Sequence, residues 1–251
     1  MTTTIDPRQY VAPTDLLAGR VILITGSSDG LGRALAIACA RVGATVVLHG
    51  RKVRKLEQVN DEIVAAGYPR PSIVPLDFEK AGPDEYGALA EAMAKEYGRL
   101  DGLVHNAGML GDRSPIEHHD VPKWLRTLHV NANAPFILTK YCLPLLKKAA
   151  DASIVFVSSG VVDHARAYWG AYLVSKWAAE GLSRMLADEL ENDHVRVNSV
   201  NPGKMRTEMR LQAYPAEDRS LLPEPEVVLA PFLYLLGGDS SGVSGQRLQC
   251  Q

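Results

Sequence analysis

Cysteine is scarce in this chain of 251 residues: only Cys39, Cys142 and Cys250 occur. They are odd in number, far apart and without Cys-x-x-Cys spacing, which argues against a disulfide framework and a cysteine zinc site. Long apolar runs are also missing. No stretch approaches the roughly eighteen residues of a membrane span, and Met1 to Gln9 lacks both the basic start and the apolar stretch of a signal peptide. These absences predict a cytoplasmic protein without a membrane partner.

An excess of charge of either sign is absent too. The chain has 27 basic and 29 acidic side chains and a formal net charge of -2. This balance gives no bulk electrostatic reason to bind nucleic acid or an anionic membrane. With 46% hydrophobic residues, the length suits one large α/β domain better than two compact ones. We therefore expect a small-molecule partner and no nucleic acid.

Short apolar runs alternate with longer helical stretches from Arg20 onward. This alternation predicts βαβ units, and strands that are apolar throughout predict a parallel sheet covered on both faces. The predicted strands are Val21–Thr25, Thr45–Leu48, Ser72–Leu76, Leu103–His105, Ser153–Val157 and Val195–Val200.

The domain is expected to span residues 19–251, with two segments of different character. Residues 1–18 are predicted to form an extended arm, because Pro7 and Pro13 oppose helix, with Leu16-Leu17 as its anchor. The region from about 204 to 226 has three prolines between a strand and the last predicted helix, and is predicted to be a mobile substrate lid.

A glycine-rich turn follows the first predicted strand and opens a helix. Such a turn lets the backbone approach a pyrophosphate, and the helix adds unpaired N–H groups and the positive end of its dipole. The spacing Gly-x-x-x-Gly-x-Gly differs from the usual Gly-x-Gly-x-x-Gly pattern, so a plain βα turn stays open on this motif alone. The predicted dinucleotide contacts within the turn are Gly26, Ser28, Gly30 and Leu31.

No acidic residue ends the second predicted strand, where a site for NAD(H) normally binds the ribose 2′-hydroxyl with a carboxylate. The chain has Arg51 there, which could form charge-assisted hydrogen bonds to a 2′-phosphate and favours NADP(H) over NAD(H). Two alternatives stay open. Arg51 and its basic neighbours could be a solvated helix start, and Asp29 would repel a phosphate unless its carboxylate points outward.

Tyr172 and Lys176 share one face of a predicted helix, because residues four apart are neighbours there. A fixed ammonium near the phenol would lower the tyrosine pKa from its ordinary value of about 10, so that it can transfer protons near neutral pH. Ser158 and Ser159 end an apolar strand shortly before. Most Tyr-x-x-x-Lys pairs are solvated helix pairs, so the preceding motifs decide whether this pair is functional.

Five motifs occur together in order: Thr25–Gly32, Asn106–Gly108, Ser159, Tyr172-x-x-x-Lys176 and Asn201-Pro202-Gly203. With them the chain resembles the short-chain dehydrogenase/reductase family over about residues 19–249. The run from residue 105 to 112 resembles a little-characterised bacterial oxidoreductase branch of that family. The resemblance implies a single-domain Rossmann fold, a doubly wound sheet of seven parallel strands in the order 3-2-1-4-5-6-7 with helices on both faces.

The resemblance also implies the site residues. The family's spacing selects Ser159 over Ser158 and Asn131 over Asn133. Asp77 and Thr207 could also act as helix-capping residues. The implied catalytic residues are Asn131, Ser159, Tyr172 and Lys176. The implied cofactor contacts beyond the glycine-rich turn and Arg51 are Asp77, Phe78, Asn106, Ala107, Gly108, Tyr172, Lys176, Pro202, Gly203 and Thr207.

These positions imply an NAD(P)-dependent oxidoreductase that transfers a hydride between the nicotinamide, with NADPH favoured, and a carbonyl or alcohol substrate. In the reductive direction Ser159 would bind the substrate oxygen and Tyr172 would donate the proton. Lys176 would lower the tyrosine pKa and hold the nicotinamide ribose. Asn131 would position a water that links Lys176 to solvent.

The pocket is expected to lie between residues 161–169, the turn after Gly108 and the lid, which favours an apolar carbonyl compound. Packing is the alternative role for each side chain there. Four histidines lack metal-ligand spacing, so no metal is expected. The candidate substrate contacts are Met109, Leu110, Tyr168, Trp169, Met205 and Met209, and the four histidines are His105, His118, His119 and His164.

Two other functions also use a Rossmann-type sheet with an early glycine-rich turn. A non-catalytic NADP(H) sensor would need only the nucleotide half of the site, and a methyltransferase that uses S-adenosylmethionine would not need the Tyr-Lys helix. In the resembling family the helices expected near residues 124–147 and 172–189 commonly form subunit interfaces. A homodimer or homotetramer is therefore expected.

Overall fold

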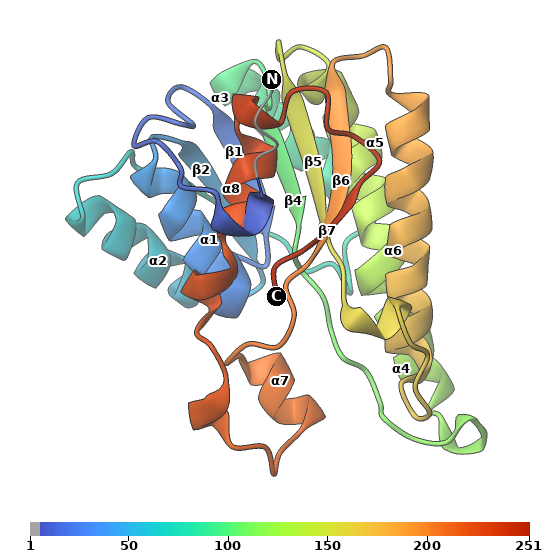
Figure 1. Ribbon diagram of the computed structural model, residues 1–251. Coiled ribbons are helices and arrows are strands. Elements are labelled where there is room, and N and C mark those ends of the chain that lie inside the picture. Colours follow the sequence, from blue (N-terminus) through green and yellow to red (C-terminus); the bar gives the residue numbers. More distant parts are fainter. Residues whose placement is uncertain (1–5) are drawn as a thin grey trace.

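The computed structural model describes residues 6–251 and contains a seven-stranded parallel sheet in the order β3-β2-β1-β4-β5-β6-β7 (Figure 1). The predicted fold class and strand order are confirmed. The strands are β1 (Val21–Thr25), β2 (Thr45–Gly50), β3 (Ser72–Pro75), β4 (Gly102–His105), β5 (Ala152–Val157), β6 (Val195–Asn201) and β7 (Arg247–Gln249).

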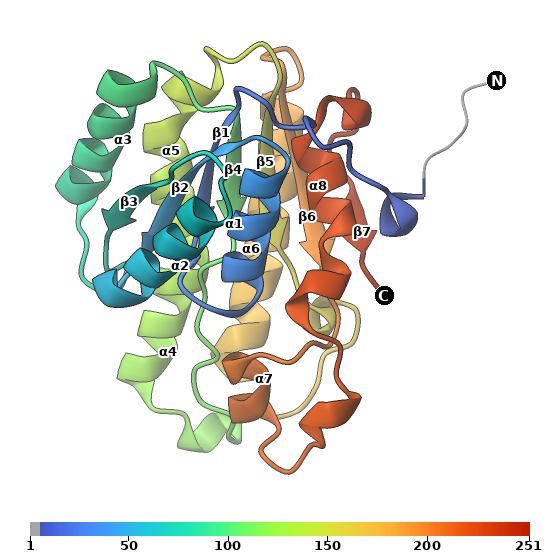
Figure 2. The same ribbon diagram turned by 90° about the vertical axis from the view of Figure 1, so that its left-hand side faces the viewer.

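Helices cover both faces of this sheet (Figure 2). One face carries α1 (Gly30–Arg41), α2 (Val53–Ala65) and α8 (Ala230–Leu236). The other carries α3 (Pro83–Tyr97), α5 (Ala134–Leu146) and α6 (Gly170–Glu189). The shorter α4 (Val121–Leu128) and α7 (Glu208–Ala213) lie beyond the ends of the strands, toward the bottom of both views.

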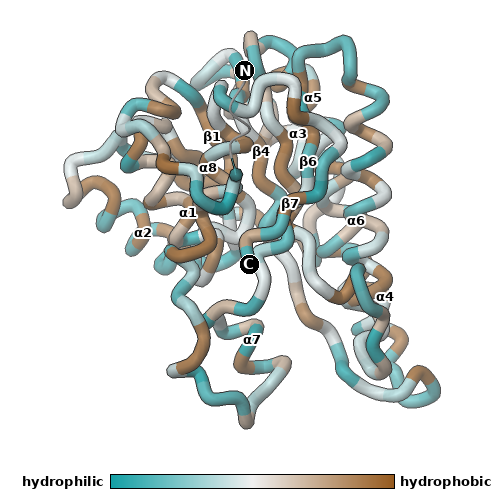
Figure 3. The backbone as a smooth tube through the Cα atoms, viewed as in Figure 1, coloured by the Kyte–Doolittle hydropathy of each residue, from teal (hydrophilic) through white to brown (hydrophobic). Residues whose placement is uncertain are grey.

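The central strands β1, β4 and β5 are largely apolar because each face of the sheet has its own core. Successive side chains of a strand point to opposite faces. In β1, Ile22 and Ile24 pack with the α1 and α8 side chains, whereas Val21 and Leu23 pack with those of α3 and α5. Figure 3 shows the resulting hydrophobic colouring along the central strands.

The N-terminal segment differs in part from the expected arm. Residues 1–5 of that arm lie outside the described residues, and Pro7–Gln9 forms a 3-10 turn where extended chain was expected. Proline is compatible with the first position of a helical turn, and the Asp6 carboxylate accepts a hydrogen bond from the Arg8 N–H. Leu17 is fully buried, as expected of an anchor.

The segment from residue 204 to 226 is not loose chain. Thr207 caps α7 by accepting a hydrogen bond from the Arg210 N–H at 3.2 Å. Met205, Ala213 and Leu222 are buried, so the segment packs against the rest of the domain. In Figure 1 it projects below the carboxyl ends of the strands.

Two buried histidines lie near these strand ends. Neither ring nitrogen of His49 has a hydrogen-bond partner, and its ring stacks on Phe78 with 4.3 Å between centroids. His105 has one ring nitrogen 2.8 Å from the Thr139 hydroxyl. Burial lowers the pKa of His49 from 6.5 to about 4 and that of His105 to about 3. Both rings are therefore neutral in the folded protein near neutral pH.

We expect the free energy of unfolding to fall as the pH drops below 6.5. Below that pH the unfolded chain takes up protons on His49 and His105 that the folded protein does not, which costs about 2 kcal/mol for each histidine between pH 7.5 and 5.0. Urea unfolding at the two pH values measures the drop. His49→Phe should remove about half of it, whereas replacing the exposed His118 by Gln should leave it unchanged. An equal drop in all three proteins would contradict this account.

Candidate active site

A cavity of about 390 Å³ opens at the carboxyl ends of β1, β2, β4, β5 and β6. It spans the boundary between β1 and β4, where the strand order reverses and doubly wound folds bind their ligands. Among the predicted catalytic and cofactor-binding residues, Asn131 is the one outside its lining. The predicted residues that line it are Gly26, Ser28, Gly30, Leu31, Arg51, Asp77, Phe78, Asn106, Ala107, Gly108, Ser159, Tyr172, Lys176, Pro202, Gly203 and Thr207.

The glycine-rich turn lines the cavity and is hydrogen-bonded to the residues that follow β4. The Asn106 side-chain amide donates hydrogen bonds to the carbonyls of Thr25 and Gly26 at 2.8 and 3.2 Å. A Cβ on Gly32 would collide with the Gly26 carbonyl oxygen and with that amide. The Thr25 hydroxyl accepts hydrogen bonds from the backbone N–H groups of Asn106 and Ala107. This organising role of Thr25 was missed in the sequence, although the residue begins the motif.

Asp29 is the residue that would repel a bound phosphate unless its carboxylate pointed outward. Its carboxylate accepts a hydrogen bond from the Gly30 N–H at 2.8 Å and pairs with Lys55 at 2.5 Å. The hydrogen bond from Lys55 holds the pKa of Asp29 below its usual range. Its charge is therefore matched by a cation, and the argument against bound phosphate is removed.

The end of the cavity beside β2 and β3 contains the residues expected around an adenosine. The Arg51 guanidinium is exposed and pairs with Glu79 at 2.5 Å. Asp77 accepts a hydrogen bond from the Glu79 N–H at 3.1 Å, so it caps a turn after β3 and not a helix, since α3 starts after Gly82. Phe78 is buried between His49 and Tyr86, which makes it part of the floor of this end.

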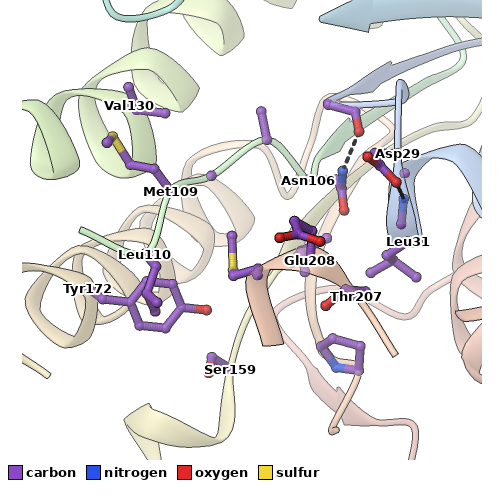
Figure 4. Close-up of a pocket in the computed structure, with 18 of the residues that line it drawn as sticks. Asp29, Leu31, Asn106, Met109, Leu110, Val130, Ser159, Tyr172, Thr207 and Glu208 are labelled. Atoms are coloured by element: carbon purple, nitrogen blue, oxygen red, sulfur yellow. Dashed lines mark hydrogen bonds between the residues drawn. The ribbon is translucent and has the colours of Figure 1, made fainter. Parts of the chain in front are cut away.

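The tyrosine and the lysine lie together at the opposite end. Tyr172 is buried, and its hydroxyl points into the cavity on the side of Ser159 (Figure 4). The Lys176 ammonium donates a hydrogen bond to the Val157 carbonyl at 2.7 Å and lies 5.7 Å from the centroid of the Tyr172 ring. The Tyr172 hydroxyl, Ser159 and the Lys176 ammonium therefore lie at the same end of the cavity.

The expected lowering of the Tyr172 pKa is not what the structure shows. Burial raises the pKa of Tyr172, and a side-chain hydrogen bond with Ser159 offsets only part of the rise. The same burial lowers the pKa of Lys176 to about 8, against the opposing effect of the Glu180 carboxylate. The prediction considered charge alone, whereas desolvation is the larger effect in a closed site.

Asn131 does not line the cavity, but its side chain holds the loop after β4, which does. The residue lies in a π-helical segment, His129–Asn133, between α4 and α5. Its side chain accepts a hydrogen bond from the Met109 N–H at 2.8 Å and donates to the Met109 carbonyl and the Ser175 hydroxyl, each at 2.9 Å. Asn131 therefore joins the loop after β4 to the helix of Tyr172. Ser175 was missed as a site residue, although it lies within the Tyr-Lys run.

The turn after β6 closes the cavity on the side of the glycine-rich turn. Gly203 has φ +78°, and a Cβ there would lie 2.6 Å from the Gln251 side chain. That side chain donates hydrogen bonds to the carbonyls of Pro202 and Lys204 at 3.0 and 2.7 Å. The methyl group of Thr207 would lie 3.2 Å from a Cβ on Gly30, so the α7 cap lies beside the glycine-rich turn.

Five of the six candidate substrate contacts line the cavity: Met109, Leu110, Trp169, Met205 and Met209. Tyr168 does not, because its backbone turns through φ +73° and leaves its side chain 57% exposed. Between residues 6 and 251, the His, Cys, Asp and Glu side chains form no group that could hold a metal ion. Within the same residues no helix is long and apolar enough to cross a membrane.

The glycine-rich turn lies where the strand order of a doubly wound sheet reverses, and Ser159, Tyr172 and Lys176 line the same cavity. This combination is typical of nucleotide-dependent oxidoreductases with a Rossmann fold. The family model for short chain dehydrogenases matches residues 20–218. The chain belongs to the short-chain dehydrogenase/reductase family. This membership contradicts the methyltransferase alternative.

Three relatives show how far the similarity extends. The uncharacterised oxidoreductase YciK of Escherichia coli K12 is 43% identical over 242 residues, 96% of each chain. A structure provisionally described as a short chain dehydrogenase of Pseudomonas syringae is 50% identical with a TM-score of 0.95, and covers 97% of this chain and 99% of its own. A similarly described protein of Escherichia coli CFT073, solved with NADPH, is 44% identical with a TM-score of 0.93 and covers 95% and 99%.

Proposed function

We propose that the protein is an NADPH-dependent reductase, or in reverse a dehydrogenase, of an apolar carbonyl or alcohol compound. The observation that carries the proposal is that Ser159, Tyr172 and Lys176 lie together at one end of a cavity that the glycine-rich turn also lines. A non-catalytic NADP(H) sensor would need only the nucleotide-binding part of this cavity. No feature of the described residues favours that alternative.

The residues present fit NADP(H). The turn from Gly26 to Gly32 would hold the pyrophosphate, and Asp77 and Phe78 would border the adenine. Arg51 would exchange its Glu79 partner for the 2′-phosphate, with which a guanidinium forms stronger, bidentate hydrogen bonds. The NADPH-bound relative from Escherichia coli CFT073 supports this assignment.

Arg51→Ala is expected to raise the Kd for NADPH by about 10-fold to 100-fold, as the loss of a charge-assisted pair requires, and to change the Kd for NADH by less than about twofold. Titration of protein and cofactor fluorescence measures both constants. The neighbouring exposed Lys52, changed to Ala, is the matched control and should change neither. Equal weakening of both cofactors in Arg51→Ala would refute the 2′-phosphate contact.

The bound nicotinamide would supply the hydride. Ser159 would donate a hydrogen bond to the substrate oxygen, and Tyr172 would deliver the proton from its hydroxyl. The Lys176 ammonium, fixed on the Val157 carbonyl, would bind the nicotinamide ribose and stabilise the phenolate left by proton transfer. Asn131 would hold the Met109 loop and Ser175 in place. A water bound beside it would link Lys176 to solvent for the transfer of protons.

The substrate end of the cavity is apolar, and we infer that residues 204–226 form its lid. Leu110, Trp169 and Ala213 are buried in one cluster with Tyr172. Arg113 joins the two sides of this end: its guanidinium lies 4.7 Å from the Trp169 ring centroid and donates a hydrogen bond to the Ala213 carbonyl. Cation-π contacts of this kind hold a segment without fixing it covalently, which suits a lid.

The direct experiment is NADPH oxidation with a panel of apolar ketones, aldehydes and quinones, begun with 9,10-phenanthrenequinone and repeated with NADH. We expect turnover with NADPH on at least one apolar member and little on sugars or charged keto acids. Saturable NADPH binding without turnover on any compound would instead support the sensor.

We also propose a homo-oligomer that forms through α5 and α6. Val174, Trp177 and Met185 are about half exposed and share one face of α6, and Phe136 on α5 is exposed as well. The family's subunit interfaces commonly use these helices. Trp177→Glu should shift sedimentation toward a smaller species by burying a charge in the interface, whereas Val53→Glu on the exposed surface of α2 should not. A monomer in the unaltered protein would contradict the proposal.

A further inference from the structure

Arg247, on β7, holds both ends of the short segment that carries Ser159. Its guanidinium donates a hydrogen bond to the Ser159 carbonyl at 3.2 Å and pairs with the Asp163 carboxylate at 2.5 and 3.1 Å. Its Nε also lies 3.3 Å from the Ser158 hydroxyl. One planar group therefore contacts three positions along residues 158–163, in the forked geometry that arginine provides and lysine does not.

Glu180 fixes Arg247 from the other side. Glu180 is 4% exposed and follows Lys176 by one turn of α6. Its carboxylate accepts hydrogen bonds from the Arg247 Nε at 3.1 Å, from the Ser199 hydroxyl at 2.9 Å and from the Ser158 hydroxyl. A buried carboxylate with this many partners is rigid, and removal of its cation leaves an uncompensated charge.

The backbone of the Ser159 segment has few hydrogen bonds without this pair, although the Val161 and Val162 side chains are buried in the cluster around Tyr172. The segment is a 3-10 turn of three residues, Gly160–Val162, and such short turns are weak on their own. The Ser159 hydroxyl makes only a 3.4 Å contact with the Val161 N–H inside the segment. Neither Arg247 nor Glu180 lines the cavity, so neither touches substrate or cofactor.

We propose that Arg247 and Glu180 are positioning residues, which hold the Ser159 hydroxyl beside Tyr172 for the transfer of the proton. The inference rests on the proposed function, because it assigns the pair a role through Ser159. It adds a specific requirement to that function: β7, at the edge of the sheet, orders the substrate-binding serine.

Amide hydrogen exchange of the NADPH-bound protein tests the placement without a substrate. Arg247→Lys keeps the charge and loses the fork, and should speed exchange across residues 158–163 by about tenfold or more while leaving residues 26–32 unchanged. Asp163→Asn, at a partly exposed position, should give a smaller increase in the same peptide.

Arg196→Lys is the matched control for this experiment. Arg196 pairs with Asp151 away from the cavity, so the variant should leave exchange of residues 158–163 unchanged. Unchanged exchange of residues 158–163 in Arg247→Lys would overturn the proposal.

A double-mutant cycle tests the route through Ser159, with turnover followed as NADPH oxidation by 9,10-phenanthrenequinone. Arg247→Lys should lower kcat by about 10-fold to 30-fold in the unaltered background and by less than twofold in Ser159→Ala, with the Kd for NADPH unchanged in both. An equal loss in both backgrounds would show a merely structural role and overturn the inference. A Ser159→Ala protein with full activity would instead refute the proposed role of Ser159 itself, so the two failures are distinct.

Discussion

Tyr172→Phe is expected to lower kcat for carbonyl reduction by about a thousandfold, within the range that a lost general acid accounts for, and to leave the Kd for NADPH within about twofold. Phenylalanine keeps the ring that packs against Leu110 and Trp169, so the pocket retains its shape. Only the hydroxyl that faces the cavity is lost. Rapid mixing of enzyme, NADPH and 9,10-phenanthrenequinone measures the effect on the first turnover, and fluorescence titration measures cofactor binding.

Tyr141→Phe is the matched control for that experiment. Tyr141 lies on α5, outside the cavity, where its ring would be within ordinary contact distance of a Cβ on Gly87. This variant should keep the turnover and the cofactor affinity of the unaltered protein. If Tyr172→Phe kept more than about a tenth of the turnover, the proton would come from another group and the assignment would be wrong.

Gly32→Ala is expected to raise the Kd for NADPH by about 100-fold or more and to lower the free energy of unfolding by about 1 to 3 kcal/mol, the usual cost of overpacking. The added methyl group would meet the Gly26 carbonyl and the Asn106 amide, and neither can move without opening the turn. Both effects come from one collision. Cofactor titration and urea unfolding measure them separately.

Gly87→Ala provides the comparison, since Gly87 is a helical glycine of α3 where a Cβ finds only ordinary contacts. It should leave NADPH affinity unchanged and should stabilise the protein slightly, because alanine is the better helix former. Tight NADPH binding by Gly32→Ala would mean that the cofactor does not approach the turn as closely as we propose.

The sheet could be predicted from the sequence because its signal is local. Each of the six strands predicted from the pattern is a short run rich in apolar residues, and each run lies between turn residues and a helical stretch. The predicted β1 agrees with the structure at both ends, Val21 and Thr25, and the other five predicted strands agree within two residues. The strand order came from the family resemblance, which the ordered motifs carried.

The electrostatics of the site could not be predicted in the same way. Burial of Tyr172 is a collective result of the lid, the Trp169 loop and α6, and no spacing within the Tyr-Lys run reveals it. The pairs Arg51–Glu79 and Asp29–Lys55 join residues more than twenty positions apart, so their cofactor roles were left open in the sequence. Such pairings depend on how the loops fold over the sheet.

The geometry behind the catalytic residues was also beyond the sequence. Asn131 was selected by the family's spacing, but its hydrogen bonds to Met109 and Ser175 depend on a π-helical segment that no residue pattern indicated. Tyr168 was placed at the pocket because it lies in the segment from residue 161 to 169, which was expected to form one wall. Its left-handed backbone turns it outward, a conformation that is uncommon for any residue with a side chain.

Transfer of deuterium from NADPH labelled at C4 of the nicotinamide tests the central claim most directly. With an apolar ketone or aldehyde of the panel as substrate, whose alcohol product keeps its carbinol hydrogen, and with each C4 position labelled in turn, the proposed reaction places the label from one of them on the carbinol carbon of the product. Mass spectrometry detects this label, and Tyr172→Phe slows its appearance. NADPH oxidation that leaves both labels out of the organic product, or that proceeds at the same rate in Tyr172→Phe, would contradict hydride transfer at this site.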